Sequence, residues 1–387
     1  MTICFFSAQY LPGVGGVERY TWNLARRTAA AGHHAVVVTS ALPHTPALPP
    51  HETDVDGIEI FRLPVWPLMR GRFPVLKPGR RFAVLTRRLW RLPVDFCVIQ
   101  TRMYTESVWA ARAARRRGIP AIVIDHSTGY MPMGGGLPGL CGRLYEQAAC
   151  AAIRRAGPRF YGVSGAVCAW LARGFGIRAA GTLPNAVAPE ELAALAAQET
   201  ASWRAALGAA ENCRLVAYVG RLIPEKGAAA LAEAVRDMPD VALAVAGDGP
   251  LLEQLRSSSP PNVVCLGSVS HAGVIRLLQQ ADVCCLPTCY AEGFPTTLLE
   301  AAACRCPIVC TRTAGTDELL PGPEYGVLLD GAGPQEIRAG LQAMLADEGR
   351  RRRCAENTYR NLLAHFTWDS VFDQLMEVAR TAPEERP

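Results

Sequence analysis

Two glutamates, Glu292 and Glu300, stand eight residues apart in the window from Pro287 to Cys310. The residues around them are typical of a strand, a loop, a helix and a second strand, and Pro295 suits the first helical position. Backbone N–H groups at a helix start favour a phosphate, because they carry the positive end of the helix dipole. A ligand whose phosphates meet this helix start could be held by a carboxylate at each end, which suits a sugar nucleotide.

The segment from Tyr218 to Gly227 contributes two cations, Arg221 and Lys226, in a short turn after an apolar run. This pair suits a diphosphate, because arginine can bind two oxygens and lysine supplies a point charge. The chain contains two lysines, Lys77 and Lys226, so a lysine in this turn is a distinctive feature. A surface arginine and lysine on an ordinary loop are the structural alternative.

These residues resemble the motifs of the retaining glycosyltransferases of family 4, which have the GT-B fold, and the resemblance extends over nearly the whole chain. The E-x7-E window and the G-R-x-x-x-x-K-G element from Gly220 carry it. The weaker matches are the glycine-rich turn at 12–19, Asp125-His126-Ser127, Tyr161-Gly162-Val163-Ser164, Pro184-Asn185, Gly247-Asp248-Gly249-Pro250 and Leu266-Gly267-Ser268. The fold implied by the resemblance is α/β, with two Rossmann-like domains facing each other across a cleft.

The resemblance also implies roles for individual residues. In the family, the first glutamate (here Glu292) binds hydroxyls of the transferred sugar, and the second (Glu300) binds the ribose. Arg221 and Lys226 would hold the donor diphosphate and stabilise the charge on the leaving group, which is expected to be the main catalytic effect.

From the other domain, Gly15 and Gly16 would approach the donor phosphate and the acceptor, and His126 would touch the donor sugar. A tight turn and a capped structural histidine are the alternatives for these two positions. The catalytic residues are thus predicted to be Arg221, Lys226, Glu292 and His126. The other predicted donor-binding residues are Glu300, Gly15, Gly16, Gly267, Gly293, Phe294, Pro295 and Thr296.

The activity that follows is transfer of a hexose-type sugar from a UDP-sugar or GDP-sugar to an acceptor hydroxyl, with retention and without a metal or other cofactor. We expect the acceptor to be a glycan or a lipid-linked glycan in bacterial envelope or surface polysaccharide synthesis. Two rivals are a GT-B sugar-nucleotide epimerase and a hydrolase that uses Glu292 and Glu300 as an acid/base pair. A third is a degenerate GT-B protein that serves as a sensor or scaffold, and it is supported by Ala186 and Arg305 where the family usually has glycine.

Composition agrees with a folded protein. Hydrophobic residues make up 50% of the 387 residues and charged ones 19%, which excludes a disordered chain. No apolar run reaches the ~18 residues that span a bilayer, and the start lacks the basic region of a signal peptide, so we expect a cytoplasmic protein. The 14 cysteines lie mostly in apolar runs without a C-x-x-C pair, so reduced core thiols are expected and zinc is not.

Charge is distributed unevenly. Residues 1–185 contain 23 Lys and Arg against 9 Asp and Glu, whereas residues 186–387 contain 17 against 26. Residues 60–94 contain nine basic residues and no acidic one, and Phe82, Leu85, Leu89 and Leu92 recur there at helical spacing. Such a segment favours attachment to an anionic membrane, peripherally on the inner face, or an ordinary core-packed helix with a solvated arginine face. Nucleic acid is disfavoured, because no recognition motif accompanies the charge.

Alternating apolar runs and helical stretches must position these residues. They predict two domains, at 1–187 and 188–366, and a C-terminal helix from 367 to 387. The resemblance implies that this final helix crosses back to the first domain. The predicted strands are 2–8, 35–39, 96–99, 121–125, 159–163, 214–219, 241–246, 263–266, 283–286 and 308–310. The predicted helices are 17–31, 105–117, 137–156, 227–238, 251–257, 271–280 and 296–304. Ligands bind such sheets at the carboxyl ends of the strands.

Overall fold

The computed structural model describes residues 1–13, 15–42, 48–131, 134, 136–200, 202–207, 213–290 and 292–382. The chain divides into two compact units: residues 1–184 with those from 371 on form unit 1, and residues 185–370 form unit 2. The predicted boundaries, 187/188 and 366/367, lie three and four residues away from these.

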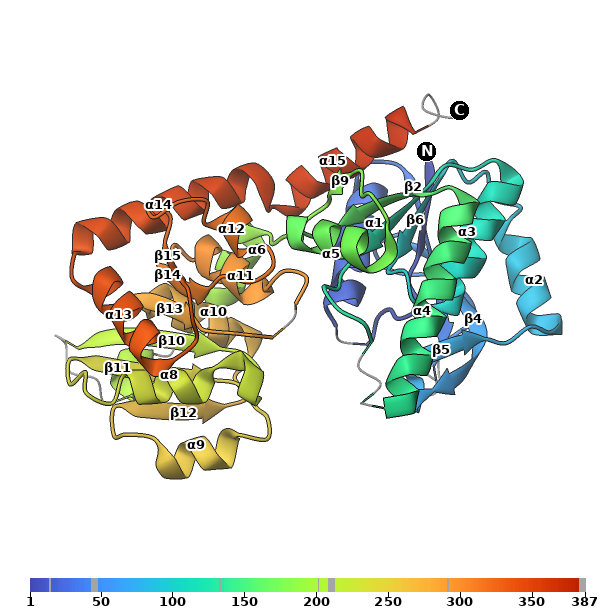
Figure 1. The fold of residues 1–387 in the computed structure, drawn as a ribbon. Coiled ribbons are helices and arrows are strands. Elements are labelled where there is room, and N and C mark those ends of the chain that lie inside the picture. Colours follow the sequence, from blue (N-terminus) through green and yellow to red (C-terminus); the bar gives the residue numbers. More distant parts are fainter. Residues whose placement is uncertain are drawn as a thin grey trace. The chain divides into compact units, whose positions relative to one another are not determined.

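Unit 1 contains a mostly parallel sheet with helices on both faces (Figure 1). Its strands are β1 (Thr2–Phe6), β2 (His34–Ala41), β3 (His51–Thr53), β4 (Glu59–Leu68), β5 (Phe73–Leu76), β6 (Phe96–Gln100), β7 (Ala121–Asp125), β8 (Arg159–Gly162) and β9 (Gly181–Thr182). Its helices are α1 (Gly16–Ala30), α2 (Arg80–Leu89), α3 (Thr105–Arg117), α4 (Gly136–Ala156), α5 (Gly165–Phe175) and, from Val371 on, α15 (Trp368–Thr381), with a 3-10 turn η1 (Met69–Gly71).

The strand order in unit 1 is β3-β4-β2-β1-β6-β7-β8-β9, and β5 pairs with β4. All pairs are parallel except those that β3 and β5 make with β4. The central strand β1 is buried along its whole length, with Phe6 opposite Val38 and Ile99. Such burial on both faces explains its uninterrupted apolar run.

Unit 2 has a wholly parallel sheet in the order β12-β11-β10-β13-β14-β15. Its strands are β10 (Arg214–Val219), β11 (Val241–Ala246), β12 (Val263–Gly267), β13 (Val283–Leu286), β14 (Ile308–Thr311) and β15 (Val327–Leu329). Its helices are α6 (Pro189–Ala196), α7 (Trp203–Ala206), η2 (Pro224–Lys226, a 3-10 turn), α8 (Ala228–Ala234), α9 (Leu252–Ser258), α10 (His271–Gln280), α11 (Thr296–Ala303), α12 (Thr316–Leu319), α13 (Pro334–Leu345) and α14 (Glu348–His365).

Each predicted strand is present, with ends within two residues of the prediction, and the predicted helices are present as well. Helix α8 ends four residues earlier than expected. The analysis missed the hairpin of β4 and β5, because Pro64, Pro67 and Pro74 argue against strands there. The cysteines form no disulfide and most are buried, although Cys141 and Cys289 are exposed. No helix in the described ranges is long and apolar enough to cross a bilayer.

The basic amphipathic segment forms α2, whose apolar stripe faces inward. Leu85 and Leu89 are buried, and the ring of Phe82 lies 5.5 Å from that of Trp109 on α3. Arg80, Arg81, Arg87 and Arg88 are exposed. Of the two interpretations, α2 therefore matches the core-packed helix with a solvated arginine face, and its apolar side is not free to enter a membrane.

The two departures from family glycines have different consequences. Arg305 follows α11 with φ of 53°, in the left-handed region, and the Cys306 N–H donates back to Ala301 O at 2.9 Å. Its guanidinium lies 4.1 Å from the centre of the Tyr359 ring, and its Nε is 3.6 Å from Glu356. Ala186 is buried and has no positive φ. Arg305 thus occupies a turn that favours glycine, whereas Ala186 causes no such strain.

Replacing Arg305 separates its backbone strain from its side-chain contact. We expect Arg305→Gly to be more stable than Arg305→Ala by about 1 kcal/mol, because both variants lose the contact with Tyr359 and only alanine keeps a side chain in the left-handed backbone. Urea denaturation monitored by circular dichroism measures the difference. The matched control is Arg360, exposed inside α14. There glycine should be the less stable variant, by about 1 kcal/mol. The same order at both positions would contradict the assignment.

Candidate functional site

Most of the predicted donor-site residues of unit 2 lie at the carboxyl edge of its parallel sheet. Arg221 and Lys226 follow β10, Gly267 ends β12, and Glu292 follows β13. Since β10 pairs with both β11 and β13, the loops after these strands are neighbours. The edge therefore gathers side chains that are up to 71 residues apart in the sequence, from Arg221 to Glu292.

The turn that carries Arg221 is held by backbone contacts with the loop after β11. Leu222 N–H donates to Asp248 O at 2.8 Å, and Gly247 N–H donates to Gly267 O at 2.8 Å. A Cβ on Gly247, whose φ is 153°, would lie 1.8 Å from the carbonyl oxygen of Gly220. No side chain fits between these two loops, so glycine at 247 is a structural requirement for the position of Arg221.

Lys226 and Glu292 form an ion pair, with Lys226 Nζ against Glu292 Oε1 and side chains 9% and 21% exposed. Both cations lie near the Tyr290 ring: Arg221 Cζ is 5.5 Å and Lys226 Nζ 5.4 Å from its centre. Arg221 is exposed and has no carboxylate partner in the described part of the chain. Cys289 N–H donates to Glu225 O at 2.7 Å, which fixes the loop of Glu292 against the turn of Lys226.

Glu300 lies on the second turn of α11, and its Oε1 is 2.9 Å from Nε2 of His271, the first residue of α10. The sequence analysis did not identify Tyr290 or His271, because neither residue belongs to a motif. Pro295 is the N-cap of α11 rather than its first helical residue, and no side chain caps this helix start. Thr296, the first helical residue, is exposed.

Phe294 and its neighbours are less accessible than the prediction implied. The Phe294 ring is buried against Phe366, with ring centres 5.3 Å apart, and its carbonyl accepts a hydrogen bond from Asn185 Nδ2 at 3.1 Å. Gly293 and Pro295 are also buried. The side chain of Phe294 therefore packs inside unit 2. Of this residue, the backbone alone stays a predicted donor contact.

The predicted glycine turn of unit 1 starts α1, with Gly15 as N-cap and Gly16 as the first helical residue. A Cβ on Gly15 would lie 2.2 Å from a carboxylate oxygen of Glu18, which is buried. A Cβ on Gly16 would meet nothing within 4 Å. A side chain at 15 would therefore require the Glu18 carboxylate to move, whereas position 16 is open. Val14 lies outside the described residues.

His126 follows β7 of unit 1, and its Nε2 is 2.7 Å from Gln100 Oε1 at the end of β6. The ring also packs edge-on against Tyr20, at 4.8 Å between centres. Burial lowers the pKa of His126 to about 4, although Asp125 opposes this. The imidazole is therefore neutral at pH 7, so one of its ring nitrogens donates a hydrogen bond and the other accepts one.

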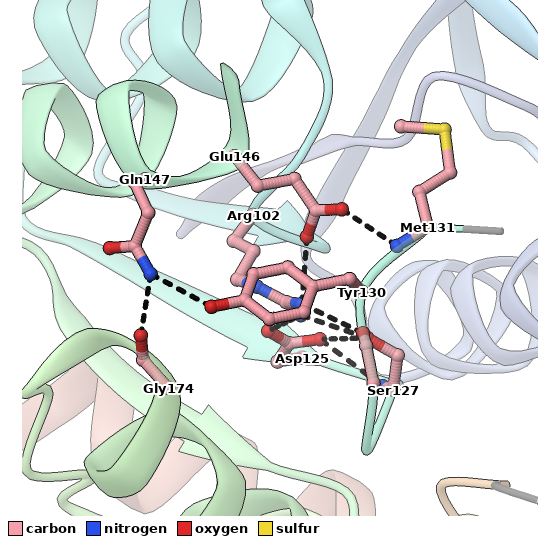
Figure 2. Close-up of polar contacts among 9 residues, drawn as sticks. Arg102, Asp125, Ser127, Tyr130, Met131, Glu146, Gln147 and Gly174 are labelled. Atoms are coloured by element: carbon pink, nitrogen blue, oxygen red, sulfur yellow. Dashed lines mark hydrogen bonds and ion pairs between the residues drawn. The ribbon is translucent and has the colours of Figure 1, made fainter. Parts of the chain in front are cut away.

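A buried charge network supports the turn after His126 (Figure 2), and the sequence analysis did not find it. Arg102 is wholly buried and donates to Asp125 at 2.5 Å, Ser127 Oγ at 2.8 Å, Gly129 O at 3.0 Å and Glu146 Oε2 at 3.0 Å. Glu146 Oε1 in turn accepts from the Met131 N–H at 2.7 Å. Arg102 thus joins the ends of β6 and β7 to α4, which fixes the backbone on the C-terminal side of His126.

The low pKa of His126 predicts a loss of stability in mild acid. The unfolded state takes up a proton near pH 6.5 and the folded state only near 4, so protonation favours unfolding as the pH falls through this range. From pH 7 to pH 5, wild type should lose about 1–2 kcal/mol more of its free energy of unfolding than His126→Gln. Denaturation at the two pH values measures this, and equal losses in both proteins would show that His126 is not buried and neutral.

Comparison with known proteins places both units in one group of enzymes. Residues 14–191 match the model of "Glycosyltransferase Family 4" and residues 199–361 that of "Glycosyl transferases group 1". The chain is 30% identical over 200 residues to a D-inositol 3-phosphate glycosyltransferase of Segniliparus rotundus, covering 48% of this chain and 43% of that one. It is 26% identical over 397 residues to a glycogen synthase of Mycobacterium tuberculosis, covering 96% and 92%.

Among solved structures, HepE of Anabaena in complex with UDP superposes with a TM-score of 0.75 at 19% identity, covering 98% of this chain and 100% of that one. The chain spans about half the length of several curated relatives that it matches. The two family models leave little of the chain unmatched, and each falls on one of the two Rossmann-like units. The chain therefore belongs to family 4 of the glycosyltransferases and has the GT-B fold.

Proposed function

We propose that the protein is a retaining glycosyltransferase that moves a hexose-type sugar from a nucleoside diphosphate sugar to an acceptor hydroxyl. The observation that carries the proposal is the cluster of Arg221, Lys226 and Glu292 at the carboxyl edge of the unit 2 sheet. Two cations beside a carboxylate suit a donor with a diphosphate at one end and sugar hydroxyls at the other. The solved HepE structure contains UDP, which agrees with a nucleotide donor.

Each proposed site residue contacts one part of the donor. Arg221 and Lys226 hold the diphosphate, Glu300 binds the ribose and Glu292 binds the sugar. Donor binding therefore replaces the Lys226–Glu292 ion pair with contacts to the ligand. His126 is proposed to accept a hydrogen bond from a sugar hydroxyl, and Gly15 and Gly16 to allow close backbone approach. The bond between the anomeric carbon and the phosphate oxygen breaks as the bond to the acceptor oxygen forms. The departing phosphate takes the acceptor proton, and the two cations stabilise its charge.

The first experiment is nucleotide binding by calorimetry with UDP, GDP and ADP and their sugar conjugates. Lys226→Ala should weaken binding of the preferred diphosphate about 10- to 100-fold, because one charge-assisted contact is lost. Lys77→Ala, the other lysine of the chain and a residue of unit 1, is the control and should bind as wild type. Glu292→Gln should retain the nucleoside diphosphate and lose the added affinity for the sugar conjugate.

The outcomes distinguish the rivals. Donor hydrolysis followed by NMR should release the sugar in the anomeric configuration of the donor, and the opposite anomer would exclude retention. Binding without turnover for every conjugate and acceptor would favour a sensor or scaffold. That rival now has little structural support, because Ala186 causes no strain and Arg305 contacts Tyr359 rather than the donor-site residues.

We also propose that the protein attaches peripherally to an anionic membrane on its cytoplasmic face, where a lipid-linked glycan acceptor would lie. The support is the tip of the β4–β5 hairpin, where Trp66, Leu68 and Met69 are 47%, 51% and 43% exposed beside Arg70 and Arg72. On α4, Leu137, Leu140 and Leu144 are also exposed. The contact of Phe73 with Tyr145, at 5.4 Å between ring centres, joins the two surfaces.

Sedimentation with lipid vesicles tests this attachment. The protein should bind vesicles that contain phosphatidylglycerol, and high salt should weaken this binding. It should not bind vesicles of pure phosphatidylcholine. Leu68→Asp and Leu140→Asp should each reduce the bound fraction several-fold, because a carboxylate is repelled by the anionic surface. Leu363→Asp, at an exposed leucine of α14 in unit 2, is the matched control. Equal effects of all three substitutions would reject this surface.

A further inference from the structure

A groove of unit 1 between α2, α3 and α4 has a composition that donor binding does not explain. Its cavity has a volume of about 560 Å³. Helix α3 packs against α4, and α2 contacts α3 through Phe82 and Trp109. The groove is lined by Trp90 after α2, by Val108 and Trp109 of α3, and by the alanines 148, 149 and 152 of α4.

One wall of this groove is apolar and rigid. The ring of Trp109 lies 5.9 Å from that of Trp90 and 5.9 Å from that of Phe6 in the sheet, and Phe82 packs at 5.5 Å. The opposite wall is formed by small side chains, which leave space beside the tryptophans. Space of this kind, bordered by aromatic rings, suits a hydrocarbon chain.

Cationic side chains line the same groove. The Arg117 guanidinium lies 4.2 Å from the centre of the Trp90 ring, and Arg112 and Arg116 of α3 also line the cavity. An adjoining cavity of about 450 Å³ is lined by Arg112, Arg115, Arg116 and Arg155 with two alanines. Positions 112, 115 and 116 share one face of the helix. No acidic residue lines either cavity.

These arginines lack counter-charges. In the described part of the chain, none of Arg112, Arg115, Arg116 and Arg155 forms an ion pair, whereas many arginines of unit 2 are paired with a carboxylate. Several like charges without a partner attract an anion.

We propose that this groove binds one anionic phospholipid, with its phosphate at Arg112 and Arg116 and part of an acyl chain along Trp90 and Trp109. The apolar wall beside the charges favours a lipid over a nucleic acid or an acidic peptide, whose polar backbones would be left without partners there. The inference deepens the proposed membrane attachment, on which it rests, because a bound lipid would anchor unit 1 beside the exposed leucines of α4. It does not depend on glycosyl transfer.

The test uses the full chain and a soluble lipid. Monomeric dihexanoyl phosphatidylglycerol should bind by calorimetry, and dihexanoyl phosphatidylcholine and inorganic phosphate should bind at least tenfold more weakly. The double variant Arg112→Gln/Arg116→Gln should lose at least tenfold in affinity. The double variant Arg173→Gln/Arg178→Gln removes the same charge from exposed positions of unit 1 and should bind as wild type.

A second variant keeps the outcome decisive. Ala148 is exposed on α4, so Ala148→Glu should fold normally and should abolish lipid binding by placing a carboxylate in the groove. Equal binding of inorganic phosphate, equal loss in the control double variant, or no loss with Ala148→Glu would each overturn the proposal. The soluble lipid should bind Leu68→Asp as tightly as it binds wild type, because Leu68 lies outside the groove. Lipid binding in the groove and vesicle attachment through the β4–β5 hairpin can therefore fail separately.

Discussion

The close backbone contacts among the loops after β10, β11 and β13 hold the residues that we propose as the donor site of unit 2. Gly247 and Gly227 have no room for a side chain, since added Cβ atoms would lie 1.8 and 2.1 Å from the carbonyl oxygens of Gly220 and Pro287. These contacts hold Arg221 and Lys226 at the carboxyl edge of the sheet, where a ligand can reach both. Electrostatic stabilisation of a leaving group requires cations held in place before the reaction, and the rigid turns provide this.

In unit 1 a buried charge network, rather than close backbone packing, holds the turn after His126 in place. Arg102, Asp125 and Glu146 are wholly buried, and removing such charges from water is costly unless each is paired and hydrogen-bonded. Their mutual contacts meet that condition and tie the turn after His126 to α4. Burial raises the pKa of Glu146, with Arg102 and the Met131 N–H opposing it. A network of this kind specifies one loop conformation, because any other would leave a buried charge without its partner.

The charged side chains of the two units have different surroundings. In unit 2 several exposed arginines pair with a glutamate three or four residues before them in the same stretch of chain. In unit 1 the surplus arginines border exposed leucines and a groove with tryptophans. Apolar surface beside unpaired cations is complementary to the interface of an anionic membrane, where charge and hydrocarbon lie a few ångströms apart. The two units therefore expose surfaces of different chemistry.

Sequence patterns alone were enough to predict the parallel architecture and the charged residues proposed to bind the donor. Uninterrupted apolar runs mark buried parallel strands, and the spacings of Arg221, Lys226, Glu292 and Glu300 place each one after a strand or early in a helix. Local patterns are sufficient for this, because hydrophobic period and turn chemistry depend on near neighbours. The hairpin of β4 and β5 was missed because its prolines mask the local pattern.

Only the tertiary structure decided which residues meet. Several contacts join segments that are far apart along the chain. They are the Lys226–Glu292 pair, the Tyr290 ring near two cations, the His271–Glu300 contact and the packing of Phe294 on Phe366. The sequence also did not predict what covers the apolar face of α2, because an amphipathic pattern does not specify the partner of its apolar side. Contacts of this kind depend on the order of strands in the sheet and on side-chain packing, which no local pattern encodes.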